Sequence, residues 1–117
     1  MTASKIVLNA ASGAGGDTTD VDDVFSTFVY SGNSSTDRDI VNNIDLSGEG
    51  GMIWTKEITG SQDHTLFDTE RGTNRINPNN DSAQFGDPDG VRAYNSNGYN
   101  LSNGGDVNAT GDKYVSW

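Results

Sequence analysis

The residues of this chain that could do chemistry gather between Gly48 and Gly72, which hold the only histidine and one of the two tryptophans. His64 follows Asp63 directly and Ser61 by three positions, so a Ser-His-Asp hydrolase is the first arrangement to test. Neighbours on one strand point to opposite faces, and Asp63 therefore cannot orient the His64 ring. No Gly-x-Ser-x-Gly elbow occurs. We expect no enzyme, and a His64 ring that packs at a strand start and hydrogen-bonds a nearby loop.

A second candidate is the pair Asp68 and Arg71, which stand three residues apart in Phe-Asp-Thr-Glu-Arg-Gly. A carboxylate and a guanidinium at a strand end can clamp a turn through a forked ion pair. The alternative is an exposed pair that contributes about 0–1 kcal/mol. Gly72 provides the sharp exit that a clamp needs. We therefore predict a structural turn lock formed by Asp68, Arg71 and Gly72.

The acidic residues raise the question of a metal, because the chain has fourteen Asp against three Glu. Asp81, Asp87 and Asp89 lie in one irregular stretch, and with backbone carbonyls they could form an oxygen cage for calcium. No Glu closes an EF-hand loop, however, and no Gly-Gly-x-Gly-x-Asp repeat occurs. We expect a solvated acidic loop and no cofactor, with calcium as the weaker alternative.

Aromatic side chains could stack on sugar rings, as they do in carbohydrate-binding sandwiches. The candidates are Trp54, Tyr94, Tyr99 and Tyr114. Aromatic residues within strands more often belong to the core, and no clear exposed row of them can be read from the sequence. Tyr94 and Tyr99 are retained as candidate sugar contacts.

The elements that must position these residues are strands. Asp disfavours helix interiors and suits turns, and no apolar pattern of period 3.6 extends over ten residues. Asp-Gly and Asn-Gly pairs mark tight turns. The pattern predicts an all-β fold, a partial antiparallel β-sandwich, with strands near 24–30, 40–46, 52–58, 64–69, 91–95, 99–101 and 112–117.

The stretch from Gly48 to Gly72 is best interpreted as a structural hairpin. Alternation in its first strand predicts two faces, one with Met52, Trp54, Lys56 and Ile58 and the other with Ile53, Thr55 and Glu57. The candidate core residues are Trp54, Leu66 and Phe67.

Two regions are expected along the chain. Residues 1–23 form an extended Gly- and Asp-rich arm, and residues 24–117 form the β-sandwich-like module. The arm is either a flexible tail or a docking segment with Ile6, Val7 and Leu8 as its adhesive patch. The last strand stops at Trp117 without a turn, so we expect an unpaired edge that further residues or a neighbouring subunit cover.

Charge narrows the classes of partner. The net charge is -10 and the pI is about 4.1, which disfavours nucleic acid and anionic membranes. No apolar run approaches the ~20 residues that cross a bilayer. The chain has no cysteine, which excludes disulfides and thiol chemistry.

Three groups of residues resemble a known family, the laminin-G/concanavalin-like domain of virion proteins from tailed bacteriophages, especially the tail-fibre type of marine and cyanobacterial phages. The first group is the hairpin, with Ile53, Trp54, Lys56, Asp63, His64, Leu66, Phe67, Asp68, Thr69, Arg71 and Gly72. The second is Tyr94, Ser96, Asn97, Gly98, Tyr99 and Leu101, and the third is the closing Tyr114, Val115 and Trp117. The family sheet continues past that last tryptophan.

The resemblance implies a structural virion component assembled in the host bacterial cytoplasm. The expected role is the N-terminal part of a tail fibre or fibre-like appendage, which attaches to the particle and contributes to host attachment. Its expected partners are other virion proteins, further copies of itself in a homo-oligomer (a trimer), and a host surface glycan. The alternatives are a lectin-like carbohydrate-binding module and a head decoration or appendage protein.

Overall fold

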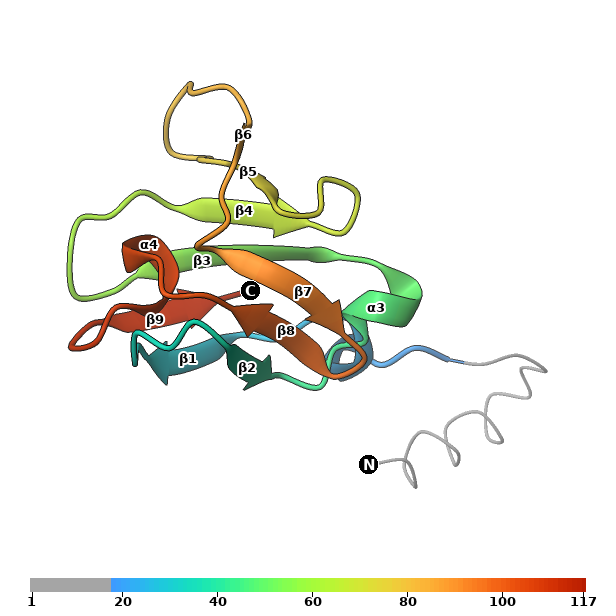
Figure 1. The fold of residues 1–117 in the computed structure, drawn as a ribbon. Coiled ribbons are helices and arrows are strands. Elements are labelled where there is room, and N and C mark those ends of the chain that lie inside the picture. Colours follow the sequence, from blue (N-terminus) through green and yellow to red (C-terminus); the bar gives the residue numbers. More distant parts are fainter. Residues whose placement is uncertain (1–17) are drawn as a thin grey trace.

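The computed structural model describes residues 18–117, and the predicted docking residues Ile6, Val7 and Leu8 lie outside that part of the chain. The described chain folds as two antiparallel β-sheets that lie against each other, with three short helices beside them (Figure 1). The prediction of an all-β, sandwich-like fold is confirmed.

The larger sheet has six strands in the order β1-β9-β3-β4-β5-β6. In that order the strands are Phe28–Ser31, Lys113–Ser116, Met52–Glu57, Thr65–Asp68, Asn74–Ile76 and Phe85–Gly86. The smaller sheet has the order β2-β8-β7, with strands Arg38–Val41, Gly98–Leu101 and Val91–Asn95. The helices are α2 (Val21–Val24), α3 (Leu46–Glu49) and α4 (Gly105–Asn108).

The predicted hairpin is present as β3 and β4, which pair Trp54 with Leu66 and Ile53 with Phe67. A second hairpin joins β7 to β8 through the predicted turn at Asn97 and Gly98. Gly98 has a φ of 153°, and a Cβ at this position would lie 1.9 Å from the carbonyl oxygen of Ile40 in β2. Glycine is therefore required here because β2 approaches the turn too closely for any side chain.

The position of β9 corrects the expectation of an unpaired last strand. β9 lies inside the larger sheet, where Tyr114 pairs with Tyr30 of β1 on one side and with Glu57 of β3 on the other. Beyond the strand, the backbone of Trp117 exchanges two hydrogen bonds of 2.9 Å with that of Trp54. Pairing with residues more than fifty positions away leaves no local sign in the sequence, which is why this strand was mistaken for an edge.

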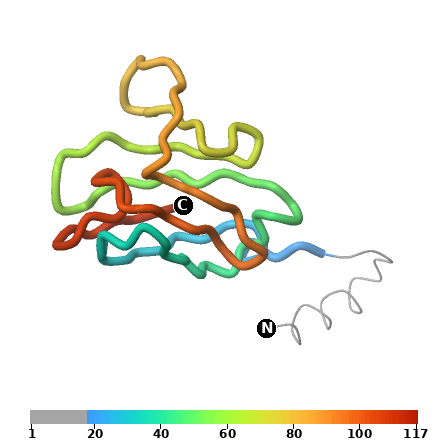
Figure 2. Tube along the Cα trace, viewed as in Figure 1, coloured from blue at the N-terminus to red at the C-terminus, as the bar shows by residue number. Residues whose placement is uncertain are grey.

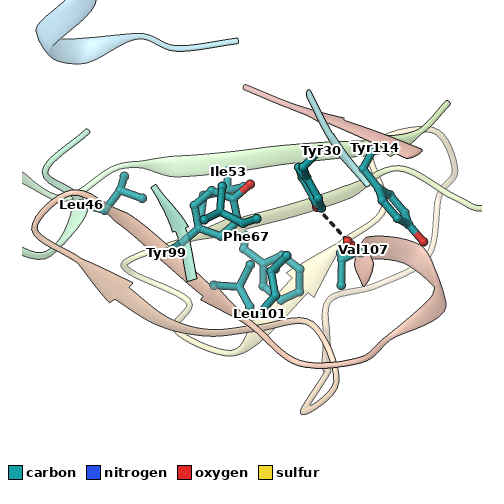
Figure 3. Packing of buried hydrophobic residues seen from close by; sticks show 10 residues of the cluster. Tyr30, Leu46, Ile53, Phe67, Tyr99, Leu101, Val107 and Tyr114 are labelled. Carbon is teal, nitrogen blue, oxygen red and sulfur yellow. Dashed lines mark hydrogen bonds between the residues drawn. The ribbon is translucent and has the colours of Figure 1, made fainter. Parts of the chain in front are cut away.

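The core lies between the two sheets (Figure 3). It is rich in tyrosine, and each buried tyrosine hydroxyl has a partner: Tyr30 donates to the carbonyl of Val107 at 2.8 Å, Tyr99 to Oγ of Ser116 at 2.7 Å, and Tyr114 to the carbonyl of Gly105 at 2.6 Å. Burial raises the pKa of Tyr99 to about 12 and also raises that of Tyr30. The buried hydrophobic residues are Tyr30, Ile40, Leu46, Ile53, Phe67, Val91, Tyr99, Leu101, Val107 and Tyr114.

The predicted core residues of the hairpin were partly wrong. Phe67 is fully buried, whereas Trp54 and Leu66 lie on the opposite face and are half-buried. Leu66 and Phe67 are consecutive in a strand and so cannot face the same side. On β3 the buried face is the more polar of the two, so hydrophobicity alone predicts the wrong face for Trp54.

The predicted boundary between arm and module falls within α2, which spans Val21–Val24. At its start the backbone N–H of Asp20 donates to Oδ2 of Asp23 at 3.3 Å. Residues 18–23 are the only part of the predicted arm that the structure describes. They lead directly to Phe25, which borders the site described below.

A long excursion between β5 and β7 projects from the two-sheet body and carries β6 (Figure 2). Arg75 anchors it, because its Nη2 lies 2.5 Å from Oδ2 of Asp106 in α4. Nη1 lies 3.1 Å from Oδ2 of Asp87 in an ion pair without hydrogen-bond geometry, and the guanidinium stands 4.8 Å from the ring centroid of Phe85. A charge that is 7% exposed thus gains two carboxylates and an aromatic face.

Candidate functional site

The face of the larger sheet that points away from the core, here called the outer face, carries an unusual number of apolar side chains. Strand alternation places them there, and each is at least partly exposed to solvent. They are Val29, Met52, Trp54, Leu66, Val115 and Trp117. Contiguous apolar patches on a protein surface are a feature of contact sites, so this face is the first place to look for one.

At one end of this face lies the aromatic recess, a shallow hollow of about 340 Å³. Its walls are Phe25, Met52, Trp54, His64 and Trp117. Phe25 is 53% exposed, Met52 50% and Trp117 39%, so three of the five walls meet solvent directly. Residues from four separate parts of the chain thus build one hollow.

The rings of the recess are held in fixed orientations around Trp54. Trp117 stands edge-on to Trp54, with ring centroids 6.4 Å apart and planes inclined by 77°. His64 meets Trp54 at 5.9 Å and 62°. Nε1 of Trp54 donates a hydrogen bond of 2.9 Å to Nδ1 of His64. Backbone pairing positions Trp54 and Trp117, and this hydrogen bond positions His64, so three of the five walls are held in place by the fold itself.

His64 stands just before β4, as predicted, but the hydrogen bond to a nearby loop comes from its backbone and not from its ring. The backbone N–H donates to Oδ1 of Asn79 in a loop at 3.0 Å, whereas the ring bonds Trp54. The carboxylate of Asp63 accepts from the side-chain amides of Asn79 and Asn80 at 3.0 and 3.3 Å. Asp63 therefore does not orient the imidazole, in agreement with the argument from strand geometry.

The predicted turn lock is formed as a two-point clamp. The guanidinium of Arg71 pairs with Oδ2 of Asp68, and the backbone N–H of Arg71 donates to Oδ1 of the same residue at 2.7 Å. Nε of Arg71 also donates to Oε1 of Gln84 at 3.2 Å. Gly72 has a φ of 65°, the left-handed conformation that ends the turn.

The candidate sugar contacts are corrected by burial. Tyr99 is 0% exposed and therefore cannot stack on a sugar ring. Tyr94 is half-buried against the core, and its hydroxyl donates to the carbonyls of Asp68 and Gly72 at 2.8 Å each. Tyr94 therefore supports the turn lock. The exposed aromatic rings in the described chain belong to Phe25, Phe85 and Trp117 instead, and Trp54 is half-buried beside Trp117.

The three weak calcium candidates do not converge. Asp81 is exposed in the loop, and Asp87 is paired with Arg75. The backbone N–H of Asp89 donates to Oδ1 of Asp87 at 3.1 Å, which closes a local turn. Within residues 18–117 no three His, Cys, Asp or Glu side chains gather closely enough to hold a metal ion.

The smaller sheet presents a polar surface on its own outward side, with its groups bonded to one another. Nδ2 of Asn100 donates to Oδ1 of Asp37 and to Oδ1 of Asp39, both at 2.8 Å. Arg92 donates to Oδ1 of Asn100 at 3.3 Å, and Asn95 donates to Oδ1 of Asp39 at 3.3 Å. This surface is an internally bonded network, in contrast to the aromatic recess.

Sequence reasoning missed Phe25 and Trp117 as parts of a site. The sequence pattern predicts Phe25 near the start of a strand and Trp117 at the end of an unpaired strand. The signal that could have found Trp117 is the motif Tyr-Val-x-Trp, because alternation from a buried Tyr114 places Trp117 on the outer face. The contact with Trp54 depends on long-range strand order and was beyond reach.

Comparison with known proteins gives a family and no function. Residues 20–117 match the family model DUF7483, which is described as a domain of unknown function. No curated protein and no solved structure shows a significant match. The helices found within residues 18–117 are too short to traverse a lipid bilayer.

Proposed function

Because the chain belongs to the DUF7483 family, whose function is unknown, we propose its function from its own residues: a non-enzymatic component of a tailed-bacteriophage particle, of the tail-fibre type. In this proposal the aromatic recess is the surface through which the domain binds another molecule during host attachment. The proposal draws on the resemblance of the hairpin and the closing strand to phage virion domains.

The observation that carries the proposal is the exposure of ordered aromatic rings on the outer face. Trp117 and Phe25 remain 39% and 53% exposed to solvent, whereas comparable rings such as Phe67 and Tyr99 are fully buried between the sheets. Solvent-exposed tryptophan is costly, and at interfaces it is the residue type that most often dominates binding energy. A binding role explains the arrangement of the recess.

The remaining parts of the proposal concern assembly. The arm of residues 1–23 attaches the chain to the particle, other virion proteins are its partners, and the module works as a homo-oligomer, a trimer. Localisation in the virion follows from these partners. The supporting observations are the Gly-rich composition of the N-terminal residues and the family resemblance.

A carbohydrate-binding module is the second candidate, favoured by the partly exposed rings of Trp54 and Trp117 in place of the predicted tyrosines. The two candidate functions differ in whether the chain is part of a phage particle, because a carbohydrate-binding module can bind its sugar as a free protein. Localisation in purified particles favours the first, and full sugar binding by the isolated chain without incorporation into particles favours the second.

The test uses particles of the phage that encodes the chain, complemented with variants of the full-length protein. Removal of residues 1–17 leaves every described strand and helix in place, and it should abolish incorporation measured by immunoblot of purified particles. Trp117→Ser should preserve incorporation and lower the adsorption rate at least tenfold. Phe85→Ser is the matched control, since Phe85 is also 39% exposed and lies outside the recess. Absence of the wild-type chain from particles would overturn the proposal.

A further inference from the structure

The walls of the aromatic recess indicate what kind of group it binds. The exposed surface of the recess comes from apolar atoms alone. A sugar ring needs a few placed donors and acceptors for its hydroxyls in addition to an aromatic platform. Trp54 cannot supply one, because its only N–H is already donated to His64. The recess therefore suits a group that stacks on aromatic faces without forming hydrogen bonds.

The geometry of the rings suits a cation of that description. Trp54 and Trp117 meet at 77°, and Phe25 adds a third ring. Walls at right angles offer a rounded cationic group several π faces at once, and each face attracts positive charge through the ring quadrupole. Met52 adds a polarizable thioether to the lining.

The net charge of the chain and the acidic residues near Phe25 in the sequence favour the same ligand. The chain carries a net charge of -10, and Asp20, Asp22 and Asp23 stand within five residues of Phe25. An acidic protein attracts cations to its surface and raises their local concentration. The ammonium of Lys56, two residues along β3 from Trp54, is held by the carbonyl oxygens of Glu57 and Gly60 at 2.5 and 3.2 Å. It is thus bound to backbone carbonyl groups and does not occupy the recess.

The His64 wall does not oppose a cation. Its Nδ1 accepts a hydrogen bond from Trp54, and a nitrogen that accepts carries no proton. In this arrangement the imidazole presents one more aromatic ring to the recess.

We propose that the aromatic recess binds a trimethylammonium group through Phe25, Trp54 and Trp117. This inference rests on the proposed function, because it names the ligand class of the same site. The group occurs in choline-bearing headgroups of surface glycans and lipids and in methylated lysine side chains. The shared chemistry is a methylated cation that has no N–H to donate.

The test is an NMR titration of the full-length chain, followed through the two indole Nε1–H signals. Choline chloride is compared with 3,3-dimethyl-1-butanol, its neutral isostere, at ionic strength matched with sodium chloride. We expect choline to bind roughly two- to thirtyfold more tightly than the isostere, the range that a cation–π contribution gives. Phosphocholine and Nε-trimethyllysine are titrated in parallel, and a preference for either supports the class and identifies its source.

Variants separate ring chemistry from apolar volume. Trp117→Leu should remove the preference for choline, Trp117→Phe should restore most of it, and Phe85→Leu should leave it unchanged. Circular dichroism confirms that each variant is folded. Equal binding of choline and the isostere, or no binding of choline, overturns the cation as ligand. Neither result bears on particle adsorption, so the proposed function is judged separately by the Trp117→Ser particles.

Discussion

The two faces of β3 have the reverse of the usual polarity, because the buried face is the more polar one. Its inward face carries Ile53, Thr55 and Glu57, all buried, while its outward face carries Met52 and Trp54, both in contact with solvent. Thr55 lies opposite Thr65 of β4, and the hydroxyl of Thr65 lacks a hydrogen-bond partner within residues 18–117. The interior therefore accepts polar groups at a cost, and the exterior keeps tryptophan.

This difference indicates which side of the sheet is shaped for stability and which for contact. A strand optimised for folding alone would place its tryptophan inside and its glutamate outside. The smaller sheet follows that rule, with Tyr99 inside and Asp39 outside. The inversion is therefore specific to the strands that build the aromatic recess, and mutations on the two faces should have unequal effects.

The largest expected effect is on the inner face. Phe67→Ala removes a fully buried ring and should lower the free energy of unfolding by about 3–5 kcal/mol. Its neighbour Leu66, half-buried on the outer face, should cost about 1 kcal/mol when replaced by alanine. Urea denaturation of the two variants measures the contrast. Equal losses would show that the outer face is as well packed as the core and would contradict its role as an open contact surface.

Much of the fold could be predicted because its signals are local. The hairpin of β3 and β4 follows from alternation and from the turn residues between them, and the Asp68–Arg71 clamp follows from their spacing at a strand end. The turn before β8 follows from the Asn97-Gly98 pair, because such pairs tolerate positive φ. Each of these features depends on residues within roughly fifteen positions of one another.

The parts that could not be predicted depend on pairing across the chain. β9 reads as an edge, yet it lies between β1 and β3. Tyr99 resembles a sugar contact, yet the opposing sheet buries it completely. The recess combines Phe25 with Trp54 and Trp117, and only the strand order brings these residues together. Local patterns identify the strands but not which face of each becomes the core.

The second prediction concerns the pH dependence of stability, to which a tyrosine buried in the core should contribute and the rings of the recess should not. The pKa of Tyr99 is raised to about 12 by burial, against a usual value near 10 in the unfolded chain. Below pH 10 both states keep the proton, so this group's contribution to stability is fully present. Between pH 10 and 12 the unfolded chain releases its proton first, and stability falls as pH rises, by about 3 kcal/mol from this residue.

Urea denaturation between pH 9 and 12 checks this loss, with Tyr99→Phe as the comparison. The variant cannot ionise at this position and should lose about 3 kcal/mol less than the wild-type chain over the same range. The exposed rings of the recess contain no ionisable phenol, so Trp117→Phe should leave the pH dependence unchanged. An identical pH dependence of Tyr99→Phe and the wild-type chain would contradict the burial of this hydroxyl.

The smallest expected effect is an increase in the free energy of unfolding. Thr65→Val replaces a fully buried hydroxyl, which has no hydrogen-bond partner in the described part of the chain, by a methyl group of similar shape. The valine keeps the β-branched form that suits a strand, and the free energy of unfolding should rise by about 1 kcal/mol. Thr27→Val, at an exposed position, is the control and should change stability by less than about 0.5 kcal/mol. A loss of stability in Thr65→Val would show that the hydroxyl has a hydrogen-bond partner in solution. The polar inner face of β3 and β4 would then carry no energetic cost, and the two faces would differ in exposure alone.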